Sequence, residues 1–166
     1  DNQWNLDLTA HDQKLYRGVV GNLSTVIGSN EFAPLFEKLC QDKRYVGYRL
    51  SGRPSEGLSE EFFRDLELTA GKGRTVDFLL GGYSLSEIQV IAKRVPDLKI
   101  IINHLGGIVL DGNPLDPNWV KSFQAVAKCP NVLCKVSALY GRVKEQSAPQ
   151  ELDFYRPVLD LAFECF

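Results

Sequence analysis

Short apolar runs alternate with longer amphipathic stretches along the whole chain. The apolar runs are rich in β-branched residues, which favour strands. They recur roughly every 30 residues, the length of one strand followed by one helix. This pattern predicts strands over residues 18–23, 45–50, 75–80, 99–105 and 132–137.

The stretches between these runs carry helix signals. They predict helices over residues 30–41, 59–71, 84–95, 116–129 and 149–166. Ser59 and Asp116 stand where N-caps are expected, and Ser84 with Glu87 forms the sequence pattern of a capping box. Gly71 is the expected left-handed residue that ends its helix.

Helix-to-strand joints indicate an α/β fold with a parallel sheet. In "IAKRVPDLKIIINH" and in "VAKCPNVLCKVS", a proline ends a helix and an apolar strand follows. Five such units fit either an open doubly wound sheet or most of a (β/α)8 TIM barrel. A complete barrel takes about 250 residues. We therefore expect residues 1–166 to form a single, incomplete barrel domain of about five βα units, truncated at both ends.

Composition narrows the class of protein. The chain has 44% hydrophobic residues and a net charge of −2, which favours neither nucleic acid nor an anionic membrane as partner. No apolar run approaches the roughly 18 residues of a membrane span. The four cysteines form no C-x-x-C pair, so we expect reduced thiols and a cytoplasmic location.

Polar residues interrupt the apolar runs near their carboxyl ends. These residues are Asn22, Arg49, Asp77, His104, Lys135 and Ser137. A strand covered on both faces is apolar at nearly every position, and an unpaired buried charge costs several kcal/mol. Because α/β enzymes build their sites at the carboxyl ends of parallel strands, we expect one cluster of acid, base and cations there.

Strand alternation predicts how these side chains point. Lys135 and Ser137 would share one side of their strand. Arg49 would share its side with Gly47, which would leave room beside the guanidinium. His104 would point to the same side as the isoleucines two and four residues before it.

Each of these residues also has a purely structural interpretation. His104 could be a hydrogen-bonded histidine at a strand end, and Arg49 could simply pair with Asp77. Lys135 could extend from the strand end into solvent. Asn22 and Asp77 could serve as turn or pairing residues.

Four segments together resemble a known family. "RGVVGNL", "KRYVGYRL", "INHLGG" and "NVLCKVSALYG" occur in the order and spacing of the amidohydrolase-related (amidohydrolase 2) family. The branch they resemble most contains lactone and 2-pyrone-4,6-dicarboxylate hydrolases. The resemblance implies a TIM barrel whose first strand carries an H-x-H pair and whose last strand carries an aspartate. Neither motif stands in this chain, so the resemblance leaves open whether the chain is itself an enzyme.

The resemblance also implies roles for the site residues. His104 takes the place of a metal ligand or carbonyl-polarising electrophile, with one divalent metal such as zinc, or with none. Arg49 and Lys135 would bind the acidic group of a small anionic substrate, with Ser137 and Asp77 as further substrate contacts. The implied reaction is hydrolysis of a small acidic lactone or related cyclic ester by an activated water.

Other functions remain open from the sequence. A decarboxylase of the same superfamily would use the same barrel and histidine, and an aldolase-type enzyme would use Lys135 as a Schiff-base lysine. A non-catalytic barrel remnant would bind a ligand or partner without turnover. Its two open sheet edges would favour pairing into a homo-oligomer.

Overall fold

A five-stranded parallel sheet organises the molecule. The computed structural model describes residues 2–54, 56–144 and 147–166. The strands are β1 (Val19–Asn22), β2 (Tyr45–Leu50), β3 (Thr75–Phe78), β4 (Lys99–Ile102) and β5 (Val132–Cys134). Each pairs in parallel with the next in chain order. A doubly wound sheet reverses its strand order at a switch point, so this order is that of an incomplete barrel, as predicted.

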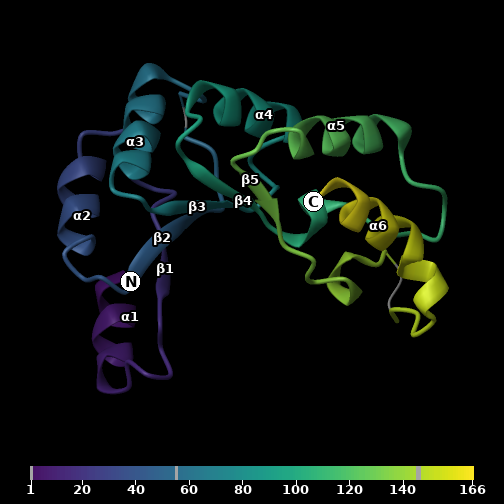
Figure 1. The fold of residues 1–166 in the computed structure, drawn as a ribbon, viewed down its shortest axis with the longest axis horizontal. Coiled ribbons are helices and arrows are strands. Elements are labelled where there is room, and N and C mark those ends of the chain that lie inside the picture. Colours follow the sequence, from purple (N-terminus) through teal and green to yellow (C-terminus); the bar gives the residue numbers. More distant parts are fainter. Residues whose placement is uncertain (1, 55, 145–146) are drawn as a thin grey trace.

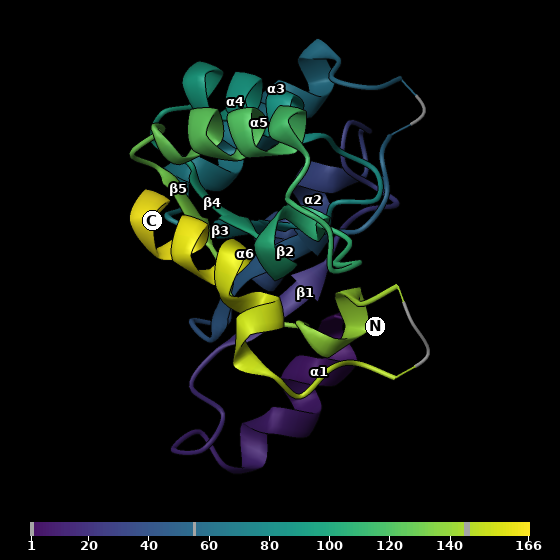
Figure 2. The same ribbon diagram turned by 90° about the vertical axis from the view of Figure 1, so that its right-hand side faces the viewer.

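Four helices follow the first four strands and cover one face of the sheet (Figure 1). They are α2 (Phe32–Leu39), α3 (Glu60–Gly71), α4 (Leu85–Arg94) and α5 (Pro117–Ala127). In Figure 2, α3, α4 and α5 lie together above the sheet, and α1 lies below it. The predicted helix over 149–166 is α6 (Leu152–Cys165), whose following residue Phe166 packs on Phe123 of α5 with ring centroids 5.2 Å apart.

One helix was not predicted. The polar amino-terminal segment forms α1 (Asn2–Leu8), continued by a short 3-10 turn, Thr9–His11. The amide of Asn2 brackets Asn22 of β1, donating to its carbonyl at 2.9 Å and accepting from its N–H at 2.7 Å. Tertiary contacts therefore hold this helix in place: the Asn2 amide on β1, the buried side chain of Leu6, and the hydrogen bond that Arg44 donates to the Leu6 carbonyl.

The two faces of the sheet differ in their surroundings. The helix-covered face carries the core, and its buried sheet residues include Tyr48, Leu50, Val76, Phe78, Ile100 and Ile102. Alternate positions point to the other face, which would be the inside of a closed barrel. There Val20 is 42% and Leu133 60% exposed. The apolar core thus lies between the sheet and α2–α5.

Helix caps follow the sequence signals with one exception. Ser59 caps α3, Ser84 and Glu87 form a complete capping box on α4, and Asp116 caps α5. The helix ends at Gly71 as predicted, but the left-handed role expected of Gly71 is wrong, because the left-handed residue is Gly73, with φ of +64°. Lys72 is the C-cap of α3, and its N–H still donates to the Leu68 carbonyl, so the left-handed residue comes one position later.

Most strands are shorter than predicted, and this changes the orientation of the site residues. β4 ends at Ile102, and His104 opens a left-handed 3-10 turn, His104–Gly107. β5 ends at Cys134, before Lys135 and Ser137. β1 and β3 likewise lose residues at their ends. Strand alternation therefore does not decide where His104 and Ser137 point, contrary to the prediction.

The expected free space beside Arg49 is also absent. A Cβ on Gly47 would lie 2.3 Å from the carbonyl oxygen and from the hydroxyl of Thr75. Gly47 is needed for close approach of β2 to β3 rather than for a cavity.

Two general features concern membrane spans and cysteines in the described part of the chain. None of the helices described is long and apolar enough to cross a membrane. All four cysteines are free thiols.

Candidate functional site

A buried aspartate and a lysine form the centre of the polar cluster. Asp77 of β3 is fully buried, and its Oδ2 forms an ion pair with the ammonium of Lys135, 58 residues further along. Lys135 directly follows β5, so its side chain must cross the end of β4 to reach β3. The lysine keeps 43% of its side chain exposed. The cluster thus spans neighbouring strands at their carboxyl ends.

Arg49 stands beside this ion pair. Its Cα is the register partner of Asp77 in the parallel ladder, so both side chains leave the same face of the sheet. The structural alternative, in which Arg49 pairs with Asp77, is not what the chain does: the ion-pair partner of Asp77 is Lys135. Arg49 is half-buried and has no carboxylate partner among the described residues. Its charge is therefore available to a ligand.

His104 lies at the same edge on a constrained turn. Its φ is +53°, in the left-handed region that residues with a Cβ rarely adopt. The imidazole Nδ1 lies 2.8 Å from the hydroxyl of Ser137. Burial lowers the pKa of His104, and the positive charges of Arg142, Arg49 and Lys135 lower it further. The imidazole is therefore neutral at neutral pH.

The structure brings the predicted residues together. Asp77 forms an ion pair with Lys135 and is the register neighbour of Arg49. His104, hydrogen-bonded to Ser137, is close enough to the cations for their charges to lower its pKa. Asn22 is separate in role, because its amide bonds the Ser24 N–H at 3.0 Å and the Ser51 hydroxyl at 3.3 Å. Asn22 thus fits the turn role rather than a site role.

Sequence reasoning missed two residues of this cluster. Arg142 belongs to the 3-10 turn after β5 (Tyr140–Arg142), and it is the first of the cations that act on His104. Asn103 is 1% exposed, and both its N–H and its side-chain amide donate to the Phe78 carbonyl. Arg142 lies in a loop without periodicity and gave no signal. Asn103 could have been noted as a polar residue inside a buried run.

Several buried polar atoms at the carboxyl ends of the strands have no hydrogen-bond partner among the described residues. Buried side-chain atoms without a hydrogen-bond partner in the described part of the chain include Arg49 Nε, Asp77 Oδ1, Asn103 Oδ1 and Arg142 Nε. An orphaned buried polar atom usually costs about 1–3 kcal/mol, so native proteins rarely keep several together without water or a ligand. These are four of the eight such atoms among the described residues, and together they make this edge the candidate binding site.

A zinc site is not formed by these residues. No group of three or more His, Cys, Asp or Glu side chains within the described residues is placed to hold a metal ion. Asp77 is the carboxylate of the cluster that could serve as a second ligand, but it already forms an ion pair with Lys135. A structural or catalytic zinc takes at least three protein ligands, so His104 alone does not fit one. The same ion pair engages Lys135, which does not support its assignment as a Schiff-base nucleophile.

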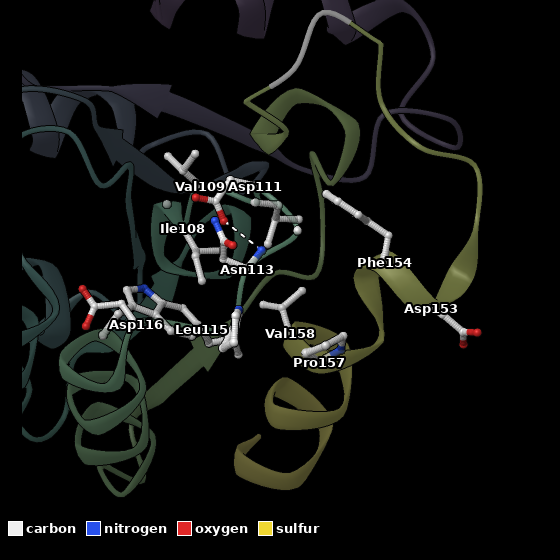
Figure 3. A pocket seen from close by; sticks show the side chains of 15 residues that line it. Ile108, Val109, Asp111, Asn113, Leu115, Asp116, Asp153, Phe154, Pro157 and Val158 are labelled. Carbon is white, nitrogen blue, oxygen red and sulfur yellow. Dashed lines mark hydrogen bonds between the residues drawn. The ribbon is translucent and has the colours of Figure 1, made fainter.

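A cavity of about 460 Å³ begins at Gly107, the last residue of the histidine turn, and none of the cluster residues lines it. Figure 3 shows the side chains of its lining. The cavity is lined by the loop that follows the histidine turn and by one face of α6. Its aspartates are committed locally: Asp111 accepts from Asn113 N–H, Asp116 caps α5, and Asp153 pairs with Arg156. We therefore place the site at the cluster around His104, where polar groups are uncommitted.

The geometry and the sequence agree with a single family. The chain belongs to the amidohydrolase family, whose model matches residues 1–166. A solved amidohydrolase from Burkholderia multivorans, in a form with bound HEPES, superposes with a TM-score of 0.76 at 18% identity, covering 99% of this chain and 60% of that one. A form of a B. multivorans amidohydrolase with bound zinc gives the same score at 59% coverage of its chain. At this identity the likeness shows a shared fold.

Two further similarities are more distant or shorter. Amidohydrolase 2 from Bifidobacterium longum subsp. infantis matches with a TM-score of 0.50 and 23% identity, over 94% of this chain and 66% of that one. An uncharacterized protein, y4mH, of Sinorhizobium fredii is 31% identical over 86 residues, which are 52% of this chain and 29% of that protein. The chain thus spans well under two thirds of that relative.

Proposed function

We propose that the protein takes part in hydrolysis of a small acidic lactone or related cyclic ester. The observation that carries this proposal is the surplus of positive charge around a neutral imidazole. Arg49, Lys135 and Arg142 act on His104, whereas Asp77 neutralises only Lys135. The two guanidiniums are left to hold a substrate carboxylate, which arginine binds through paired hydrogen bonds.

The chemistry follows from the same arrangement. A guanidinium that binds the acidic group would fix the substrate carbonyl near His104. A neutral imidazole can either accept a proton from an attacking water or donate a hydrogen bond to the carbonyl oxygen. The cations would stabilise the negative charge that develops on that oxygen. Ring opening then gives a hydroxy acid, with the water proton passing to the leaving alkoxide.

A metal does not enter these steps. A similar solved amidohydrolase holds zinc, but the described residues of this chain bring no group of three or more His, Cys, Asp or Glu side chains together that could hold a metal ion. A cytoplasmic location is proposed on the four free thiols, which are typical of a reducing compartment.

The test uses the full-length natural protein and matched substrates. A lactone bearing a carboxylate is compared with its uncharged amide by following ring opening. We expect the acidic lactone to be preferred at least tenfold in kcat/KM. Arg49→Gln and Arg142→Gln should each raise KM about tenfold for the acidic substrate and leave the neutral one unchanged.

His104→Ala decides the central assignment. General acid–base catalysis typically contributes 10²–10⁴-fold, so we expect kcat to fall at least about a hundredfold. Full activity in this variant would remove His104 from the site. Release of carbon dioxide would identify a decarboxylase, and binding measured by calorimetry without turnover would identify a non-catalytic remnant. Either result overturns the hydrolase proposal.

A further inference from the structure

The hydrogen bond between His104 and Ser137 fixes one side of the imidazole. The Ser137 hydroxyl lies 2.8 Å from Nδ1. The other ring nitrogen, Nε2, has no hydrogen bond to any residue that the structure describes. The two nitrogens lie on opposite sides of the ring, so holding Nδ1 also determines where Nε2 points.

Both partners of this bond sit on or beside strained backbone. His104 has φ of +53°, and Ala138, directly after Ser137, has φ of +57°. With Leu105, at +52°, they are the non-glycine residues with positive φ in the part of the chain described. Left-handed backbone is unfavourable for residues with a Cβ and persists where the surroundings require it, which is often at functional sites.

Backbone hydrogen bonds hold the two loops in register. The N–H of Lys135 donates to the carbonyl of Ile102 at 2.8 Å, and the N–H of Leu105 donates to the carbonyl of Lys135 at 3.1 Å. One of these bonds involves Ile102, before His104 in the sequence, and the other involves Leu105, directly after it. The loop that carries Ser137 and the turn that carries His104 are therefore held together past the ends of β4 and β5.

The surrounding charges favour a lone pair on whichever ring nitrogen faces them. A serine hydroxyl can donate to Nδ1 or accept from it, so the 2.8 Å distance alone does not decide. Arg142, Arg49 and Lys135 all place positive charge around the ring. A lone pair is favoured near positive charge, whereas an N–H is not. Because Nδ1 lies against Ser137, a lone pair that faces these cations would be the one on Nε2.

We propose that Ser137 is a positioning residue whose hydroxyl accepts the Nδ1–H of His104 and thereby leaves Nε2 with a free lone pair. The consequence for chemistry rests on the proposed function. With this tautomer His104 accepts a proton from water instead of donating a hydrogen bond to the substrate carbonyl. It also gives Ser137 a role through His104, distinct from the substrate contact expected from the sequence.

The experiment is NMR of ¹⁵N-labelled histidine in the chain, without any substrate. The chain has two histidines, His11 and His104, so two sets of ring signals are expected. His11 is an internal reference, because its Nδ1 lies 2.5 Å from the Leu8 carbonyl, which can only accept. Spectra are recorded at about pH 8.5, roughly two units above the usual pKa of imidazole. We expect both rings to show the proton on Nδ1. A proton on Nε2 of His104 would overturn the proposal.

Two variants separate positioning from folding. Ser137→Ala should move His104 toward the tautomer mixture of a free imidazole and leave His11 unchanged, whereas Ser137→Thr keeps a hydroxyl and should keep the wild-type pattern. An unchanged His104 pattern in Ser137→Ala would refute the role of the hydroxyl. If Ser137→Ala does not fold, the wild-type spectrum and Ser137→Thr still decide.

Activity gives an independent reading. In the full-length natural protein we expect Ser137→Ala to lower kcat about tenfold or more with KM changed less than about twofold, and Ser137→Thr to recover most of it. Failure of lactone hydrolysis in the wild type would remove the proposed function but leave the tautomer result standing. The wrong tautomer would remove this proposal but leave hydrolysis standing.

Discussion

Asp65 and Asp77 are buried to nearly the same degree, 1% and 0% exposed, but their surroundings differ. Asp65 lies in α3 on the helix-covered side, and its Oδ2 accepts the N–H of Gly28 at 2.8 Å. Asp77 lies on the opposite face of the sheet and pairs with Lys135, while its Oδ1 has no partner among the described residues. One carboxylate ties a loop to a helix, and the other belongs to a group of uncommitted polar atoms.

The difference teaches how to recognise a site. Burial raises the pKa of Asp65, and its hydrogen bond to Gly28 and the charge of Arg64 only partly oppose this effect. Both carboxylate oxygens of Asp65 have partners among the described residues, the Gly28 N–H and the Arg64 guanidinium. Arg49 is the register neighbour of Asp77, and Arg142 belongs to the same cluster through its charge on His104; each has an unpartnered buried Nε among the described residues. A buried carboxylate is therefore weak evidence of function, and the unpaired groups beside it are the stronger evidence.

The largest expected effect comes from removing the lysine. Lys135→Met leaves Asp77 buried without its cation. Breaking a fully buried pair costs about 3–5 kcal/mol, and because Lys135 is partly exposed we expect about 2 kcal/mol in urea unfolding. The matched control is Arg64→Met, because Arg64 is 63% exposed and lies 3.9 Å from Asp65. This control should change stability by less than about 0.5 kcal/mol. Equal losses in both variants would erase the distinction between the two aspartates.

Local sequence signals account for most of the fold. The five strands and the helices after them follow from apolar runs, caps and prolines, because these elements are decided within about ten residues. Helix α1 depends instead on a contact to β1, twenty residues away in sequence, through the Asn2 amide. No local pattern encodes such a contact.

The sequence predicted which residues belong to the candidate site better than it predicted how their side chains are arranged. Arg49, Asp77, His104 and Lys135 were found because charged or polar residues break apolar runs at strand ends. The orientation of His104 was not, because a left-handed turn replaces the strand after Ile102 and cancels the two-residue alternation. The choice of Lys135 over Arg49 as partner of Asp77 depends on side-chain reach across β4, which the sequence does not reveal.

Asp65→Asn should have a smaller effect of opposite sign. Its pKa in the folded protein is raised above the unfolded value of about 3.9, so the folded state binds a proton more tightly. Ionisation of Asp65 therefore lowers the free energy of unfolding as the pH rises from about 4 through the folded-state pKa of this group. The amide oxygen of Asn can still accept from Gly28. We expect the variant to be more stable than the wild type at pH 7 and to show a flatter dependence of stability on pH between about pH 4 and pH 7. Urea unfolding across this range checks the sign, and a steeper profile would contradict it.

The smallest effect is expected on the uncovered face of the sheet. Leu133 and Val132 are neighbours in β5 that point to opposite faces, and they are 60% and 5% exposed. Val132→Ala should cost about 1.5 kcal/mol, because it removes buried methyl groups from the core. Leu133→Ala should cost less than about 0.5 kcal/mol, because its side chain already contacts water. Denaturant unfolding at two protein concentrations measures both. If Leu133→Ala instead costs as much as Val132→Ala, another surface covers this face in solution, and a concentration-dependent loss would identify that surface as a second copy of the chain.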